Sequence, residues 1–391
     1  MDELKHIYML SHEIGPRGST KSNEELAAQY IKDEMEKTGM DMEVQDFSSV
    51  KSFSWTYGFI YLSFVLAFFI FITSPLLAFV ICAFSLITFR REANTKETIS
   101  RLMPKGRSQN ILGKIPAQKY PVIKMIFVAH YDTSKSGISF HPEMVKNFRS
   151  IFLLGYFSMI VITFVFGISI IFNRLGFNDY NILWYFTTPF ALVLFSSFLV
   201  LLHREMFGKY TPGANDNASG VSVLLETARE VKNSPPDFIE TCFLTTGCEE
   251  AGTVGMIRFL EEYKLDKKKT FFINMDNIGS GDLKYIMQEG VLKRYASNDK
   301  LVKKASLSAR EKPEIKVSGA SYHLLTTDAT AALARDYNAM TILAMNKEGQ
   351  LPNWHWHTDT VERIEKDNLL TARTLALRIL YNIDKSVNSF K

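Results

Sequence analysis

Four stretches of the sequence contain no Asp, Glu, Lys or Arg and are rich in Phe, Leu and Ile: residues 55–72, 75–89, 151–172 and 182–202. An α-helix needs about 20 apolar residues to cross a bilayer, and the last two stretches match this length. The second stretch is shorter and begins at Pro75, so its helix either crosses the bilayer or re-enters it. The pattern predicts an integral membrane protein with four spans, arranged as two transmembrane hairpins at residues 53–90 and 149–203.

The remaining segments, residues 1–52, 91–148 and 204–391, lie on one side of the bilayer if the chain crosses it an even number of times. Lys and Arg residues near the spans concentrate on this side, whereas the other side carries Arg174 alone. The cations of the larger side are Lys51, Arg90, Arg91, Lys96, Arg101, Lys146, Arg149, Arg204 and Lys209. The positive-inside rule therefore predicts that the large polar part is cytoplasmic. Because the spans hold few polar groups beyond hydroxyls, they are expected to anchor the protein and not to conduct a solute.

The composition excludes several classes of protein. A chain with 47% hydrophobic and 22% charged residues is too apolar to be disordered. Its 45 basic and 41 acidic residues leave a net charge of only +4, so nucleic acid is not an expected partner. Cys82, Cys242 and Cys248 form no CxxC pair, which argues against a disulfide framework and against a thiolate zinc site.

The polar part of the chain alternates buried-type strands with amphipathic helices. The expected strands are residues 121–129, 239–245, 270–275 and 339–345. Helical periodicity begins after Asn23 and recurs at about 219–233, 253–264, 298–309 and 367–387. This alternation predicts an α/β domain with a mixed, mostly parallel central sheet flanked by helices.

Acidic and imidazole side chains follow the ends of these strands. His130 and Asp132 follow the first, Glu249 and Glu250 the second, and Asp276 the third. Two loops add Asp216, within residues 212–220, and His355 and His357, within residues 354–360. Ligands bind beyond the carboxyl ends of parallel strands, and imidazole with carboxylate suits a hard divalent metal. The sequence therefore predicts a metal site, and the number of ligands suits two ions.

Two cations can share a bridging carboxylate and a bridging water, whose pKa they lower. A further carboxylate must then stay unligated to take the proton from the water. The adjacent residues Glu249 and Glu250 can supply one ligand and one base. Asp132, two residues after His130 on an extended chain, faces the same way and can orient the imidazole.

In these motifs and their order the chain resembles the di-zinc aminopeptidase family, which also includes glutamate carboxypeptidase-like proteins, glutaminyl cyclases and the transferrin receptor ectodomain. The matching segments are Ile14-Gly15-Pro16-Arg17, His130-Tyr131-Asp132, Gly213-Ala214-Asn215-Asp216-Asn217-Ala218-Ser219-Gly220, Glu249-Glu250-Ala251-Gly252, Asn274-Met275-Asp276 and the late histidine loop. The resemblance implies a zinc-exopeptidase-like fold and two divalent ions, most simply Zn²⁺.

The resemblance also implies a role for each matching residue. One metal would be held by His130, Asp216 and Asp276, and the other by Asp216, Glu250 and a late histidine. The family places that histidine four residues before an Asp-Thr pair, so Asp359-Thr360 selects His355 over His357. Glu249 would act as general base on a metal-bridging hydroxide, assisted by Asp132.

The chain departs from soluble members in the spacing of its motifs. Asp216 follows His130 by 86 residues, and the third and fourth spans fill the excess. The two hairpins thus interrupt a peptidase domain formed by residues 1–52, by residues 91–148 with the first metal ligand, and by residues 204–391 with the others. We expect the active site to open close to the bilayer, which would favour apolar or membrane-derived peptides.

These features predict a membrane-anchored, zinc-dependent exopeptidase, specifically an aminopeptidase, with a peptide substrate and the lipid bilayer as its partners. Carboxypeptidase action and glutaminyl cyclisation are alternatives within the same family. A non-catalytic receptor or scaffold is a further alternative, although such relatives lose ligands and none is missing here. The sequence specifies neither the side-chain preference nor the oligomeric state. It assigns no chemistry to Asp328 and favours packing roles for Trp354 and Trp356.

Overall fold

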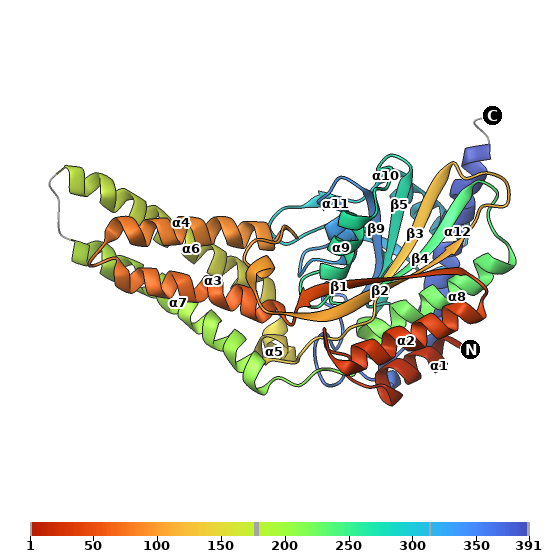
Figure 1. Cartoon of the computed structure of the whole chain (residues 1–391), viewed down its shortest axis with the longest axis horizontal. Helices are drawn as coiled ribbons and strands as arrows, with labels where there is room; N and C mark the ends of the chain where they lie inside the picture. Colours follow the sequence, from red (N-terminus) through yellow and green to blue (C-terminus); the bar gives the residue numbers. More distant parts are fainter. Residues whose placement is uncertain (1, 176–179, 313, 389–391) are drawn as a thin grey trace. The chain divides into compact units, whose positions relative to one another are not determined.

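The computed structural model describes residues 2–175, 180–312 and 314–388 (Figure 1). The chain divides into two compact units. The first unit comprises residues 1–51, 104–135 and 210–391, and the second comprises residues 52–103 and 136–209.

The first unit is built on a nine-stranded sheet with the order β1-β2-β4-β3-β5-β9-β6-β7, in which β8 pairs with β6. Its strands are β1 (Asp41–Val50), β2 (Lys105–Ile115), β3 (Ile123–His130), β4 (Ile239–Thr246), β5 (Thr270–Met275), β6 (Asp282–Glu289), β7 (Tyr295–Ala296), β8 (Ser318–Tyr322) and β9 (Asn338–Met345). The four expected strands correspond to β3, β4, β5 and β9. Their apolar runs are buried on both faces, as the centre of an α/β sheet requires.

The centre of the sheet is parallel and its margins are largely antiparallel. The neighbours β4, β3, β5 and β9 run parallel to one another, as do β6 and β8. The pairs β1–β2, β2–β4, β6–β7 and β6–β9 are antiparallel. The predicted α/β class with a mixed central sheet is therefore confirmed, whereas "mostly parallel" is not, because four of the described strand pairs are parallel and four are antiparallel.

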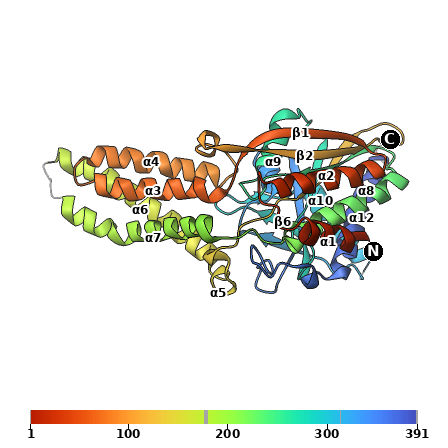
Figure 2. The same cartoon turned by 60° about the horizontal axis from the view of Figure 1, so that its bottom comes forward.

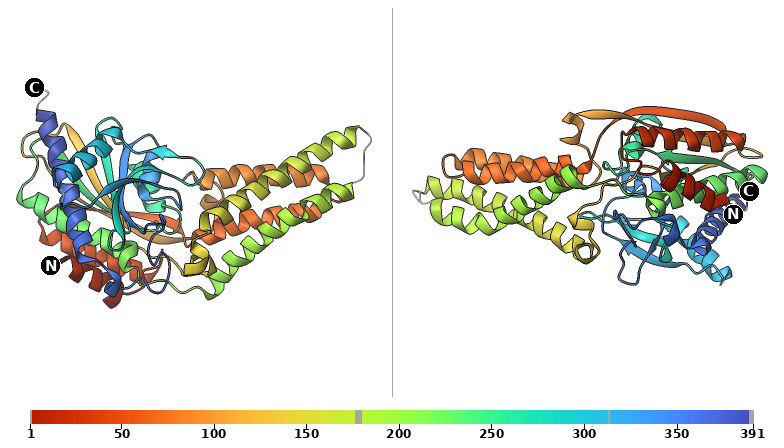
Figure 3. Two further views of the ribbon diagram at one scale, coloured as in Figure 1. Left: turned by 180° about the vertical axis from the view of Figure 1, so that it is seen from behind. Right: turned by 90° about the horizontal axis from the view of Figure 1, so that it is seen from below.

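Helices cover both faces of this sheet (Figure 3). One face packs against helices α1, α2, α8, α10 and α12, and the other packs against α9 and α11. The side chains of β3 alternate accordingly, with Phe127 in the first core and Ile126 in the second. The helices are α1 (Asp2–Tyr8), α2 (Ser22–Lys37), α8 (Gly220–Asn233), α9 (Val254–Glu262), α10 (Asp299–Glu311), α11 (Asp328–Leu333) and α12 (Lys366–Asn388).

The second unit is a bundle of four long helices (Figure 2). They are α3 (Phe53–Ile70), α4 (Pro75–Glu92), α6 (Phe148–Arg174) and α7 (Tyr180–Phe207), and a short helix, α5 (Pro142–Val145), precedes α6. Helix α3 packs against α4 and α7, and α6 packs against the same two helices. The contacts are mainly apolar: for example, the rings of Phe71 and Phe166 stack with centroids 4.0 Å apart.

Among the described residues, three helices are long and apolar enough to cross a membrane: Phe53–Ile70, Phe148–Phe172 and Asn181–Phe207. This finding rests on length and composition alone. Helix α4 lacks an uncharged run of this length because its last turn contains Arg90, Arg91 and Glu92. The span predicted at 75–89 therefore stays a prediction. The predicted connection at 173–181 lies partly outside the described residues.

Candidate metal centre

Three neighbouring parallel strands bring the predicted residues to one edge of the sheet. His130 is the last residue of β3, while Glu249 and Glu250 follow β4 and Asp276 follows β5. Asp216 lies in the loop before α8, and His355 lies in the loop after β9. The carboxyl ends of adjacent parallel strands meet at one edge, so residues far apart in the sequence converge there.

Asp216 stands between two histidines. The Nε2 atom of His130 lies 3.2 Å from Asp216 Oδ1 and 3.4 Å from Asp276 Oδ1. The Nε2 atom of His355 lies 3.2 Å from Asp216 Oδ2 and 3.0 Å from Glu250 Oε1. The five residues thus form two groups of three that share Asp216, with a different carboxylate oxygen facing each group.

These distances fit two bound cations. Zinc holds N and O ligands at about 2.0–2.2 Å in a tetrahedron, which separates neighbouring ligand atoms by about 3.3–3.6 Å. The observed separations within the groups, 3.0 to 3.4 Å, lie at or just below this range. All five side chains are buried, and three buried carboxylates so close together require compensating positive charge. The donor chemistry of the site therefore suits a pair of divalent ions.

The two histidines of loop 353–359 differ in burial and in their contacts. Asn353 and His355 both have left-handed backbone conformations, and backbone hydrogen bonds from Trp356 to Asn353 and from Asp359 to Trp356 close the turn. His355 is buried in the second ligand group, whereas His357 is exposed and belongs to neither group. The indole of Trp354 is buried.

Asp132 is fully buried and contacts the segments that carry His130, Glu249 and Ser19. Its Oδ1 accepts a hydrogen bond from the Glu249 amide at 3.0 Å and lies 3.6 Å from Nδ1 of His130. Its Oδ2 accepts hydrogen bonds from the Glu250 amide at 3.1 Å and from the Ser19 hydroxyl at 2.6 Å. The Asp132 carboxylate therefore holds the backbone of the Glu-Glu pair by two hydrogen bonds, while Nδ1 of His130 is hydrogen-bonded at 3.2 Å to the backbone carbonyl of Asp132.

Glu249 directly precedes Glu250, a member of the second group, but belongs to neither group itself. Burial raises the pKa of its carboxyl group well above the ordinary value, and the carboxylates of Asp328, Glu250 and Asp276 raise it further, against the opposing effect of His130. The direction of this shift favours the protonated form of the Glu249 carboxyl group.

Asp359 contributes to the site although the sequence analysis used it only as a marker. Its Oδ1 accepts a hydrogen bond from the Asn215 amide at 2.6 Å, and its Oδ2 accepts one from the Asp216 amide at 3.0 Å. Burial raises its pKa to about 7. These hydrogen bonds fix the backbone of Asp216, the residue that both groups share.

Two further buried residues, Asp328 and Tyr322, lie within electrostatic reach of the two groups. The sequence patterns assigned no chemistry to Asp328 and did not indicate Tyr322. Asp328, at the start of α11, accepts a hydrogen bond from Thr246 Oγ1 at 2.5 Å, and burial raises its pKa to about 7. Burial likewise raises the pKa of Tyr322, at the end of β8, and the carboxylates of Asp276, Asp216 and Glu249 add to the shift. The Thr-Thr-Asp run at 326–328 was the only sequence signal for either residue.

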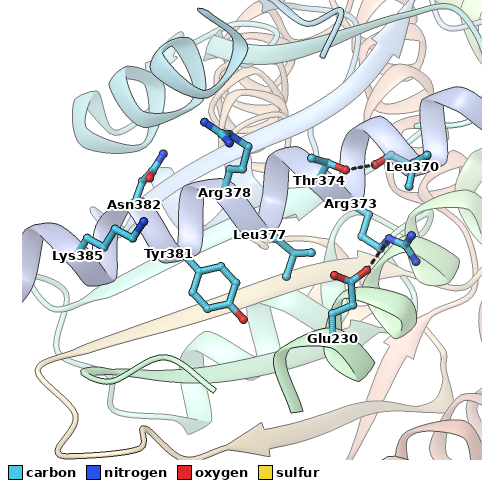
Figure 4. Close-up of a pocket in the computed structure, with 9 residues that line it drawn as sticks. All are labelled: Glu230, Leu370, Arg373, Thr374, Leu377, Arg378, Tyr381, Asn382 and Lys385. Carbon is cyan, nitrogen blue, oxygen red and sulfur yellow. Dashed lines mark hydrogen bonds and ion pairs between the residues drawn. The ribbon is translucent and has the colours of Figure 1, made fainter. Parts of the chain in front are cut away.

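A surface pocket of about 360 Å³ lies between α8 and α12 (Figure 4). Its lining residues are Glu230, Leu370, Arg373, Thr374, Leu377, Arg378, Tyr381, Asn382 and Lys385. Arg373 is paired with Glu230 at 3.1 Å, and Arg378 is paired with Glu311. Because none of the predicted site residues lines it, we assign this pocket no part in the metal centre.

Comparisons with known proteins show which families and structures this chain is similar to. Residues 199–380 match the model of Peptidase family M28. Aminopeptidase YwaD of Bacillus subtilis is 30% identical over 185 residues, which are 45% of this chain and 39% of that protein. The probable lipoprotein aminopeptidase LpqL of Mycobacterium tuberculosis is 36% identical over 81 residues, 20% of this chain and 16% of that protein. The chain thus matches less than half the length of these relatives.

Solved structures share the fold over almost the whole chain. A zinc aminopeptidase from Bacillus subtilis, BSAP, superposes with a TM-score of 0.57 at 15% identity, covering 97% of this chain and 94% of the other. A glutaminyl cyclase from Tannerella forsythia does so with a TM-score of 0.56 at 16% identity, covering 97% and 98%. At these identities the likeness establishes the fold alone.

Residues 199–380 thus resemble family M28, the fold is that of the zinc aminopeptidase and glutaminyl cyclase structures, and the two groups of His, Asp and Glu side chains are of a kind that could hold metal ions. These findings support the resemblance seen in the sequence motifs. The family match begins at residue 199, so His130 and the N-terminal segment lie outside it.

Proposed function

We propose that this protein is a membrane-anchored, zinc-dependent aminopeptidase that removes N-terminal residues from peptides. The observation that carries the proposal is the sharing of Asp216 between two ligand groups, with Glu249 beside them in neither group. A site with only one complete group would favour single-metal chemistry, whereas both groups are complete here. His130, Asp216 and Asp276 would hold one ion, and Asp216, Glu250 and His355 the other.

When bound, the two ions would supply a Lewis acid for the scissile carbonyl and would lower the pKa of an attacking water. Glu249 would take one proton from that water as the new C–O bond forms. The same carboxyl group would then give the proton to the leaving amine as the C–N bond breaks. Asp132 would keep the imidazole of His130 and the 249–250 backbone in place, so that Glu249 stays aligned throughout.

Paired peptides test the reaction. Detergent-purified protein is incubated with one peptide in two forms, with a free and with an acetylated N-terminus, before and after chelation and after zinc is restored. We expect cleavage of the free peptide only, its loss on chelation and its return with zinc.

Other outcomes identify other reactions. Cleavage of the acetylated peptide would contradict the aminopeptidase proposal and indicate a carboxypeptidase or endopeptidase. Conversion of an N-terminal glutaminyl peptide without hydrolysis would indicate a cyclase. No reaction from a folded protein that holds two zinc ions would favour a receptor or scaffold role.

The proposed anchor is the second unit, with the first unit in the cytoplasm and apolar or membrane-derived peptides as substrates. Three of its helices have the length and composition of membrane spans. Large apolar side chains remain exposed along these helices, including Phe69 on α3, Phe164 on α6 and Phe186 on α7, which are 63%, 65% and 56% exposed. Such surfaces are costly in water and suit contact with lipid.

Cysteine labelling tests the anchor and its orientation. Thr73, between α3 and α4, and Lys303, on α10, are both exposed, while the native cysteines are all buried and give little background. In intact cells an impermeant thiol reagent is expected to label the Thr73→Cys variant and not the Lys303→Cys variant, and both should be labelled after permeabilisation. The reverse pattern would contradict the cytoplasmic assignment. Release of the protein by alkaline carbonate would contradict the anchor itself.

A further inference from the structure

We propose that Arg17 is a positioning residue of the metal centre, which holds together the two chain segments that carry His130 and Asp216. The inference rests on the proposed two-ion function, because it concerns how that site is assembled. It adds a residue of the N-terminal segment, outside the matched family region, to the machinery that binds the ions.

The guanidinium of Arg17 is fully buried and donates hydrogen bonds only to backbone carbonyls among its described contacts. Its Nε donates to Tyr131 at 2.8 Å, and its Nη2 donates to Gly213 at 2.9 Å. Its Nη1 donates to Leu10 at 2.6 Å, to Pro212 at 2.9 Å and to Gly15 at 3.1 Å. Carbonyls of three separate segments therefore converge on one planar cation.

Two of these segments border the metal ligands. Tyr131 lies between His130 and Asp132, while Pro212 and Gly213 lead into the Asp216 loop. Between them the chain leaves the first unit after residue 135 and returns at residue 210. The guanidinium of Arg17 therefore bonds to the segments on both sides of this interruption. Tyr131 directly follows His130, and Gly213 lies three residues before Asp216.

Neighbouring backbone contacts bind the same N-terminal segment to the His130 side. The amide of Arg17 donates to Thr133 Oγ1 at 2.9 Å, and the Thr133 amide donates to the Arg17 carbonyl at 3.0 Å. The hydroxyl of Ser19 donates to Asp132, which in turn accepts from the amides of Glu249 and Glu250. A displacement of residues 17–19 would therefore be transmitted to both ligand groups.

The charge of Arg17 also matters to the site. Burial lowers the pKa of its guanidinium to about 10, against the opposing effect of the carboxylates of Asp359, Asp132 and Asp216, so the group remains a cation at neutral pH. This buried cation therefore offsets part of the negative charge of the buried carboxylates.

Gly213 packs closely against Arg17 and Thr133. Gly213 has a φ of +66°, and a Cβ there would lie 2.2 Å from Thr133 Cγ2 and 2.9 Å from Arg17 Nη2. A lysine at position 17 would keep the charge, but its single ammonium group cannot reach Tyr131, Leu10 and Gly213 simultaneously. Arg17→Lys therefore removes the simultaneous hydrogen bonds of the guanidinium to these carbonyls while keeping a cation.

The test measures zinc binding to the full-length protein in detergent, with free zinc set by a chelator buffer and bound zinc counted per chain. Wild type, Arg17→Lys and Ser19→Ala are compared with Arg378→Lys, a matched control whose guanidinium pairs with Glu311 on another helix. Unfolding by urea in excess chelator reports the stability of each metal-free protein.

We expect Arg17→Lys to need 10- to 100-fold more free zinc for half-occupancy of both ions, the range typical of outer-shell substitutions. Ser19→Ala should shift in the same direction, and Arg378→Lys should match wild type. The binding of both ions should weaken together, because Asp216 belongs to both groups. Wild-type zinc binding by Arg17→Lys would overturn the proposal, as would a shift fully accounted for by lower metal-free stability.

If Arg17→Lys does not fold, Ser19→Ala decides, since it removes a single hydrogen bond: weaker zinc binding supports the proposal and unchanged binding overturns it. The readout uses no substrate. A wild-type protein that binds two ions but cleaves no peptide would therefore defeat the proposed function and leave the role of Arg17 standing. Normal zinc binding by an active Arg17→Lys enzyme would defeat the proposed role of Arg17 and leave the proposed function standing.

Discussion

Replacement of Glu249 by Gln is expected to lower peptide hydrolysis by a factor of about 10²–10⁴ while both zinc ions stay bound. Glutamine keeps nearly the same size and can still accept hydrogen bonds, but it cannot take a proton from the attacking water. Glu249 belongs to neither ligand group, so its substitution removes no metal ligand. The measurement is the initial rate on a free N-terminal peptide, together with the zinc content of the same sample.

Glu261→Gln is the matched control for this substitution. Glu261 is an exposed residue of α9 whose carboxylate pairs with Arg258 at 2.8 Å, and its loss should leave the rate unchanged. A Glu249→Gln protein with near wild-type turnover would show that another group moves the proton. Loss of an ion from that protein would instead make Glu249 a ligand.

Replacement of Asp216 by Asn is expected to remove both ions, because its two carboxylate oxygens face different ligand groups. An amide carries no charge and offers only one oxygen. His355→Ala, by comparison, should remove the ion of the second group and leave that of the first. Zinc counted per chain should therefore fall from two to none in the first variant and to one in the second, and hydrolysis should be lost in both.

The exposed neighbour His357 supplies the control for this series. His357→Ala should retain two ions and full activity, because its side chain belongs to neither group. Loss of an ion from His357→Ala, with retention by His355→Ala, would exchange the roles of the two histidines. Retention of both ions by Asp216→Asn would contradict the shared-ligand arrangement.

The sequence patterns predicted the centre of the fold best. The strands β3, β4, β5 and β9 are apolar runs with polar residues at their ends, and burial on both faces makes such runs easy to recognise. Because parallel strands share one edge, the same pattern predicted that His130, Glu250 and Asp276 would lie close together. The structure brings these residues together with Asp216 and His355.

The antiparallel margins and the supporting residues were harder to predict. Strands β1 and β2 are half-polar, since each exposes part of one face, and nothing local specifies their partners. Arg17 and Asp359 each stand in a motif of the family resemblance, but their hydrogen bonds join backbone atoms of distant segments, and nothing in the sequence specifies these partners. Their positions depend on the complete fold.

The central claim is that one carboxylate, that of Asp216, joins two metal ions in this chain. Anomalous scattering at the zinc edge from crystals of the zinc-loaded protein tests it most directly. We expect two peaks per chain, one contacted by His130, Asp216 and Asp276 and the other by Asp216, Glu250 and His355. A single peak, or two peaks that do not share Asp216, would contradict it.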